Sequence, residues 1–177
     1  MATQALSERT GAITFKGEAK TLVGSELRVG DALPEFTLVG GDLSPVTPKT
    51  LAQRGAGLLI VVPSLDTGVC SLEAKTFDGR LGELPAGVTA YVVSRDLPFA
   101  QGRWGKEHGA KLTMLSDYLN HSFGRATGLE IKELGLLARA LVVFGGDGRV
   151  TYVQLVREVT QEPNYDEAIA AARDAAS

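Results

Sequence analysis

The chain has 177 residues, with 18 basic and 21 acidic side chains and a formal net charge of −3. It has no basic surplus for nucleic acid, and its longest apolar run, residues 57–63, is far shorter than the ~20 residues of a membrane-spanning helix. We therefore expect neither nucleic acid nor membrane as a partner. A chain of this length is typical of one domain, so residues 1–177 are predicted to form a single domain, with the small and polar residues 1–11 flexible.

The only cysteine, Cys70, bears on the cellular compartment. One thiol cannot form a disulfide within the chain, and an unpaired thiol is typical of a reducing environment. The N-terminal residues also lack the basic segment and the apolar run of a secretory signal. We therefore expect a cytoplasmic protein.

The first half of the chain predicts a hairpin, two strands and a helix. ITFKG at 13–17 and KTLVG at 20–24 flank a Gly-Glu-Ala turn and predict an N-terminal β-hairpin, and EFTLVG after Pro34 predicts a short strand. The unbroken apolar run at 57–63 is typical of a parallel strand that is covered on both faces. Residues 67–84 follow as a helix, because their apolar side chains fall within half of the helical circumference.

The second half alternates strands with helices and ends in a second hairpin. The predicted elements are a buried strand at 88–95, a weak helix at 99–107, a short strand at 111–115, a helix at 119–128, an antiparallel hairpin at 138–156 and a final helix at 164–175. Asn164 is the expected cap of the final helix. This order predicts an α/β fold in which a mixed β-sheet is flanked by helices, as in thioredoxin-like proteins.

Cys70 lies where the predicted helix after the central strand begins. If Asp66 or Thr67 caps that helix, free backbone N–H groups of the first turn can stabilise a thiolate. Gly68 keeps the approach open, and Pro63 ends the strand and shapes one wall of a pocket at the carboxyl edge of the sheet. The alternative is that Cys70 is a small buried hydrophobe, as many free cysteines are.

The spacing Pro63-x-x-x-Thr67-x-x-Cys70 is the active-site motif of the peroxiredoxins. The wider string PSLDTGVCSLEAKTF and the later segments SRDLPFAQGRW, LLARALVV and LVREVTQEPNYDEAI resemble the atypical thiol peroxidase branch of that family. The resemblance covers roughly residues 13–172 and includes the N-terminal hairpin. It implies a thioredoxin-like peroxiredoxin fold and a thiol-dependent peroxidase.

The resemblance assigns a role to each residue of the motif. Cys70 is the thiolate that attacks the peroxide and becomes a sulfenic acid, Thr67 orients the peroxide, and Pro63 shields the intermediate from solvent. Arg139 holds the thiolate and stabilises charge on the departing oxygen. The alternatives are a helix cap for Thr67 and an exposed arginine at a strand start for Arg139.

Candidate substrate-binding residues are less specific. Gly68 and Val69 neighbour the thiol, and Phe99 and Trp104 flank the DLPFAQGRW segment, where they can line an apolar wall. Packing of a weak helix explains Phe99 and Trp104 equally well. No metal ion or cofactor is expected, because the single cysteine and the two histidines lack the spacing of a metal site.

The sequence departs from the family where a resolving cysteine is usual, since Gly105 stands at that position. The remaining routes for the sulfenic acid are a Cys70–Cys70 disulfide between chains, a low-molecular-weight thiol followed by a glutaredoxin-like protein, and attack by a thioredoxin-like thiol. We favour the second route, because only a small molecule then has to reach the sulfur. The alternative function is a peroxide sensor that passes its oxidation to a partner without sustained turnover.

The resemblance also implies a homodimer and a preference for organic hydroperoxides over hydrogen peroxide. The apolar residues around the motif are consistent with that preference.

Overall fold

The computed structural model describes residues 5–176, which form two β-sheets and the helices that cover them. The larger sheet has seven strands in the order β11-β10-β5-β6-β7-β3-β4. Its strands are β3 (Leu38–Gly40), β4 (Pro45–Val46), β5 (Ala56–Val61), β6 (Val88–Ser94), β7 (Thr113–Ser116), β10 (Ala140–Phe144) and β11 (Val150–Leu155). The β5–β6 and β6–β7 pairs are parallel and the other pairs are antiparallel, which confirms the predicted mixed sheet.

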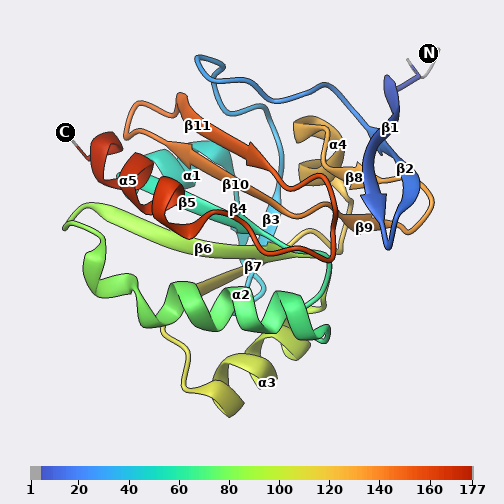
Figure 1. Cartoon of the computed structure of the whole chain (residues 1–177). Coiled ribbons are helices and arrows are strands. Elements are labelled where there is room, and N and C mark those ends of the chain that lie inside the picture. Colours follow the sequence, from blue (N-terminus) through green and yellow to red (C-terminus); the bar gives the residue numbers. More distant parts are fainter. Residues whose placement is uncertain (1–4, 177) are drawn as a thin grey trace.

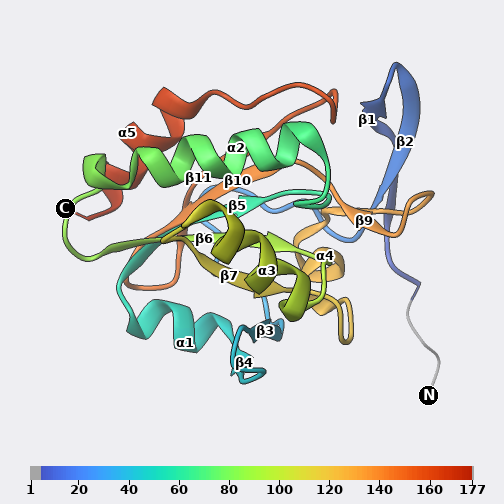
Figure 2. The same cartoon turned by 90° about the horizontal axis from the view of Figure 1, so that it is seen from below.

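Helices lie on both faces of this sheet (Figures 1 and 2). They are α1 (Pro48–Gln53), α2 (Gly68–Gly79), the short 3-10 helix η1 (Leu81–Glu83), α3 (Pro98–His108), α4 (Ser122–Thr127) and α5 (Tyr165–Ala175). The views show α2 and α5 on one side of the sheet and α1 on the other. The predicted α/β architecture with helices on both faces is therefore confirmed.

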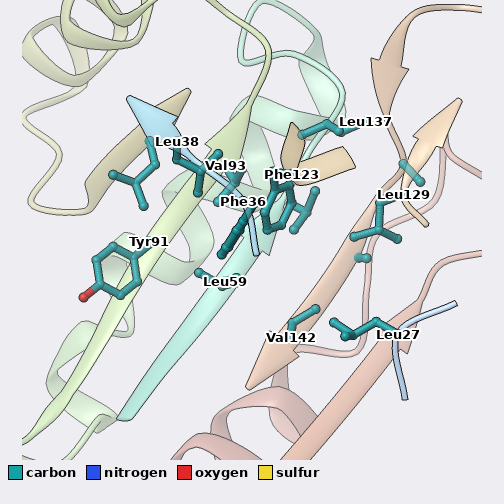
Figure 3. Packing of buried hydrophobic residues seen from close by; sticks show 14 of the residues in the cluster. Leu27, Phe36, Leu38, Leu59, Tyr91, Val93, Phe123, Leu129, Leu137 and Val142 are labelled. Carbon is teal, nitrogen blue, oxygen red and sulfur yellow. The ribbon is translucent and has the colours of Figure 1, made fainter. Parts of the chain in front are cut away.

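The central strand β5 shows why two helical layers form. All six of its residues are buried, and alternate side chains point to opposite faces. Leu58 and Ile60 belong to a cluster that includes Cys70 and residues of α2, α3 and α5. Leu59 belongs to the cluster on the other face, part of which Figure 3 shows. An apolar run of this kind stabilises a strand only when both faces are covered.

The smaller sheet contains the N-terminal hairpin. Its strands, in the order β1-β2-β8-β9, are β1 (Glu8–Phe15), β2 (Glu18–Val23), β8 (Glu130–Ile131) and β9 (Leu136–Leu137). The predicted hairpin is confirmed, but its turn lies at Lys16 and Gly17, with φ of 52° and 82°, instead of at Gly-Glu-Ala. Because β1 begins at Glu8, the prediction that residues 1–11 are flexible is wrong for residues 8–11, and residues 1–4 lie outside the described range.

The helix predicted over 67–84 is shorter in the structure. It ends at Gly79, and η1 continues the chain. Leu72, which the apolar pattern placed on the buried side, is 47% exposed, whereas Cys70, Glu73, Ala74 and Phe77 are buried. The buried face of α2 therefore carries the thiol and a carboxyl group.

The remaining predicted elements are confirmed. The 138–156 hairpin forms as β10 and β11, and the Asn164 side chain accepts a hydrogen bond from the Glu167 backbone N–H at 3.1 Å as the cap of α5. Among the helices of residues 5–176, none combines the length and apolar character that crossing a membrane requires.

Candidate active site

The segment between β5 and α2 brings Cys70 to the carboxyl edge of the central strands. Thr67 is the N-cap residue of α2 with extended backbone angles, and Cys70 is the third residue of the helix. Two groups of this segment donate hydrogen bonds to the Asp96 carboxylate. They are the Ser64 hydroxyl, at 2.6 Å, and the Leu65 backbone N–H, at 2.8 Å. Asp96 follows β6, so the neighbouring parallel strand fixes the segment that precedes the thiol.

The Thr67 hydroxyl does not cap the helix through its side chain. It donates to the Ser64 carbonyl oxygen at 3.0 Å, so its oxygen keeps lone pairs for another donor. The helix-cap explanation of this threonine therefore accounts for its backbone position but not for its hydroxyl.

Arg139 lies beside the thiol and is only 2% exposed. Its Nη2 donates to Cys70 Sγ at 3.3 Å, its Nε donates to the Val159 carbonyl at 2.8 Å, and its Nη1 is hydrogen-bonded to Glu73. The alternative of an exposed arginine at the strand start is thus wrong. A buried guanidinium requires negative partners, and here a carboxyl group and a sulfur provide them.

Glu73 is the functional candidate that the sequence analysis missed. It is fully buried, and its Oε1 atom has no hydrogen-bond partner. Burial raises the pKa of its carboxyl to about 7, although the attraction of Arg139 acts in the opposite direction. The guanidinium that pairs with this carboxyl also faces the sulfur, so Glu73 and Cys70 share one buried cation.

A cavity of about 340 Å³ lies next to the Thr67 and Arg139 side chains. Its lining includes Pro63, Thr67, Gly68, Val69 and Arg139, and these predicted site residues are therefore brought together. The other lining residues are Phe15, Lys16, Leu136, Val159 and Thr160. Cys70 is fully buried beneath this lining and contacts Arg139.

Phe99 and Trp104 lie elsewhere in the structure. Phe99 is 67% exposed at the start of α3, and Trp104 packs in the helical layer, where its indole N–H donates to the Ser71 hydroxyl at 3.0 Å. We therefore leave both out of the proposed substrate site. Gly105, at the usual resolving position, is also in α3, and a Cβ there would come within 3.3 Å of the flexible end of Met114.

The sequence does contain a pattern that could have identified Glu73 as a functional candidate. It lies three residues after Cys70 and shares the helix face of Cys70, Ala74 and Phe77. A carboxyl group on an apolar face indicates a buried partner of opposite charge. The cavity residues from the N-terminal hairpin had no such signal, because their position depends on contacts with residues more than a hundred positions away.

Replacement of Glu73 by Gln tests the raised pKa. The pKa of the Glu73 carboxyl in the folded protein, about 7, lies above its ordinary value of 4.5, so the folded state binds this proton more tightly than the unfolded state. The protein therefore loses stability as the pH rises between these two values. The Gln variant has no such ionisation. We expect the free energy of unfolding of Glu73→Gln, relative to wild type, to increase from pH 4.5 to pH 7 in urea titrations. A constant difference across this range contradicts the assignment.

Comparison with known proteins agrees with this geometry. The sequence matches the Redoxin family over residues 28–169. It is 48% identical to a thiol peroxidase of Clostridium acetobutylicum over 92% of this chain and 98% of that protein, and 44% identical to a thiol peroxidase of Bacillus subtilis over 91% and 96%. The crystal structure of a peroxiredoxin-like protein from Aquifex aeolicus has a TM-score of 0.85 and 38% identity and covers 97% of this chain and 99% of that chain.

A thioredoxin-like fold with a thiol at a helix start beside a buried arginine is the arrangement of a thiol redox enzyme, and this chain belongs to the Redoxin family. Within that family it is a peroxiredoxin-type thiol peroxidase, an oxidoreductase that reduces peroxide at the expense of a thiol.

Proposed function

We propose that Cys70 is the peroxidatic cysteine and that it reduces organic hydroperoxides and hydrogen peroxide. Its thiolate attacks the terminal peroxide oxygen, an S–O bond forms as the O–O bond breaks, and the departing oxygen takes up a proton to leave as alcohol or water. The product on the protein is a sulfenic acid. The observation that carries the proposal is the 3.3 Å contact between the Arg139 guanidinium and Cys70 Sγ beneath the cavity.

Each neighbour of the sulfur has a part in this reaction. Arg139, whose guanidinium is fixed by Glu73 and Val159, donates to the sulfur and stabilises negative charge on the departing oxygen. The Thr67 hydroxyl, whose proton is donated to the Ser64 carbonyl, accepts a hydrogen bond from the peroxide O–H and so orients the peroxide. Pro63 closes one wall of the cavity and offers no N–H to water.

The cavity lining supports the preference for organic hydroperoxides. Five of its residues carry apolar side chains, namely Phe15, Pro63, Val69, Leu136 and Val159. A volume of about 340 Å³ lies within the usual range of small-molecule sites. An organic substituent would displace water from this apolar surface, whereas hydrogen peroxide has no group that gains from it.

The reductant is proposed to be external, since the chain holds one cysteine. Cys70 is fully buried, so a low-molecular-weight thiol that enters the cavity reaches it with less rearrangement than a thioredoxin- or glutaredoxin-like protein requires. A Cys70–Cys70 disulfide would need the two Cα atoms to approach within about 7 Å. The homodimer remains a proposal that rests on the family resemblance, and the cytoplasmic location remains one that rests on the single unpaired thiol.

Catalytic turnover distinguishes a peroxidase from a peroxide sensor. The sensor is the second candidate function, because the chain has no second cysteine to act as a resolving thiol. Peroxide consumption should be followed with a small thiol in excess, and in parallel with a thioredoxin system. Sustained consumption in either assay supports the peroxidase. One equivalent consumed, followed by a stable mixed disulfide with a single protein, supports the sensor.

Thr67 offers a matched pair of variants. Thr67→Val removes the hydroxyl and keeps the side-chain shape, and we expect oxidation of Cys70 by cumene hydroperoxide to slow by about tenfold to a hundredfold, the range for a hydrogen bond to a charged group. Thr67→Ser keeps the hydroxyl and should stay close to wild type. A loss in Thr67→Ser but not in Thr67→Val, measured by rapid mixing, would assign the effect to packing of the methyl group instead.

A further inference from the structure

Two distant parts of the chain form the outer wall of the active-site cavity. Phe15 and Lys16 come from the turn of the N-terminal hairpin, and Val159 and Thr160 come from the segment after β11. Figures 1 and 2 both show this segment next to the hairpin. The shape of the wall depends on how these two parts are held together.

Backbone hydrogen bonds make the first connection. The Thr14 N–H donates to the Arg157 carbonyl at 2.7 Å, and the Val159 N–H donates to the Thr14 carbonyl at 2.9 Å. These bonds attach the end of β1 to the segment. They do not reach the turn itself, where Lys16 and Gly17 adopt positive φ.

The Glu158 carboxylate makes the second connection and does reach the turn. Its Oε1 accepts from the Gly17 N–H at 2.7 Å and from the Thr14 hydroxyl at 3.1 Å. Its Oε2 accepts from the N–H and the hydroxyl of Thr160 at 2.8 and 2.6 Å. One side chain therefore joins the residues next to Phe15 and Lys16 to the residues next to Val159.

All four donors are neutral, and within residues 5–176 no basic group forms an ion pair with this carboxylate. The hydroxyl and N–H of Thr160, followed by the N–H of Gly17, lower the pKa of Glu158 to about 2. The side chain is therefore ionised at neutral pH and acts as a hydrogen-bond acceptor. Because all four hydrogen bonds of this carboxylate go to neutral donors in the hairpin and in the segment after β11, its charge holds these two segments together.

We propose that Glu158 is a positioning residue that fixes the hairpin turn against the 159–160 segment, so that the cavity holds the organic part of a hydroperoxide with its O–O bond toward Cys70. This inference rests on the proposed function and deepens it. Hydrogen peroxide has no organic part, and without Glu158 the Arg139 side chain keeps its bonds to Glu73 and Cys70. Val159, which accepts from Arg139 Nε, stays attached to the Thr14 carbonyl through its own N–H. Loss of Glu158 therefore changes the choice between peroxides.

The test compares oxidation of Cys70 by hydrogen peroxide and by cumene hydroperoxide in Glu158→Gln. Gln is isosteric but loses one acceptor and the charge. We expect the cumene hydroperoxide rate to fall about tenfold, as for a substrate held in a displaced position, while the hydrogen peroxide rate stays within about twofold of wild type. Amide hydrogen exchange of residues 14–17 should become faster. Glu35→Gln, the same charge change at an exposed site, is the control and should alter neither rate.

Several results would overturn the inference. They are equal losses with the two peroxides, no loss with either, or unchanged amide exchange at the turn. If Glu158→Gln does not fold, Thr14→Val removes one of the four donors and should show the same selectivity to a smaller extent. Wild-type protein that reacts with both peroxides no faster than free cysteine contradicts the proposed function, whereas the amide exchange still decides whether Glu158 holds the turn.

Discussion

Replacement of Arg139 by Met is expected to slow the oxidation of Cys70 by on the order of a hundredfold to a thousandfold, the effect of removing a fixed donor to developing negative charge. The same change should lower the free energy of unfolding by about 3–5 kcal/mol, because it leaves Glu73 buried without its partner. Rapid mixing measures the first effect and urea unfolding the second.

The two effects can be separated in a double variant. Arg139→Met combined with Glu73→Gln removes both charges of the buried pair, which is often nearly neutral for stability. We expect stability to recover largely while oxidation stays slow. If the rate recovers together with stability, Arg139 supports the fold and has no part in the reaction.

Gly57→Ala should destabilise the central sheet by about 1–3 kcal/mol, the usual range for overpacking a filled core. Gly57 pairs with Phe144 across β5 and β10, and a Cβ at this position would lie 2.7 Å from Phe144 Cε1 and still closer to Cζ. Phe144 is fully buried, so its ring has no open space to enter. Because β10 follows Arg139 directly, the guanidinium depends on this pairing.

Two further variants check this explanation. Gly102→Ala places a Cβ in α3 with no atom within 4 Å, and it should be neutral or stabilising by about 0.5–1 kcal/mol. Gly57→Ala with Phe144→Leu should lose less than the sum of the two single changes, because the smaller side chain makes room. Additive losses in thermal or urea unfolding would show that the ring contact is not the cause.

The fold could be predicted where short-range patterns decide it. The apolar run of β5, the Gly-rich turn between β10 and β11 and the Asn164 cap each act within a few residues, and each is present as expected. The two-residue strands β8 and β9 could not be predicted. They exist only because β8 pairs with β2, more than a hundred residues away.

In the functional site, too, residues marked by short-range patterns could be predicted and residues placed by long-range contacts could not. Cys70, Thr67 and Pro63 lie within eight consecutive residues, so their spacing made them visible, and Arg139 was found through its family motif. Glu73 was missed although it shares the helix face of the thiol. The wall from Phe15 and Lys16 could not be seen, because it depends on the Glu158 contacts and on a turn in which Lys16, a residue other than glycine, adopts positive φ.

The central claim is that Cys70 is a peroxidatic thiolate, and single-turnover oxidation tests it most directly. Reduced protein is mixed with one equivalent of cumene hydroperoxide, with Cys70→Ser as the control. The fluorescence of Trp104 can report the reaction, because its indole N–H donates a hydrogen bond to the hydroxyl of Ser71, the residue after Cys70. We predict oxidation orders of magnitude faster than that of free cysteine and no signal in the control. A Cys70 that reacts at the rate of an ordinary thiol would contradict the account.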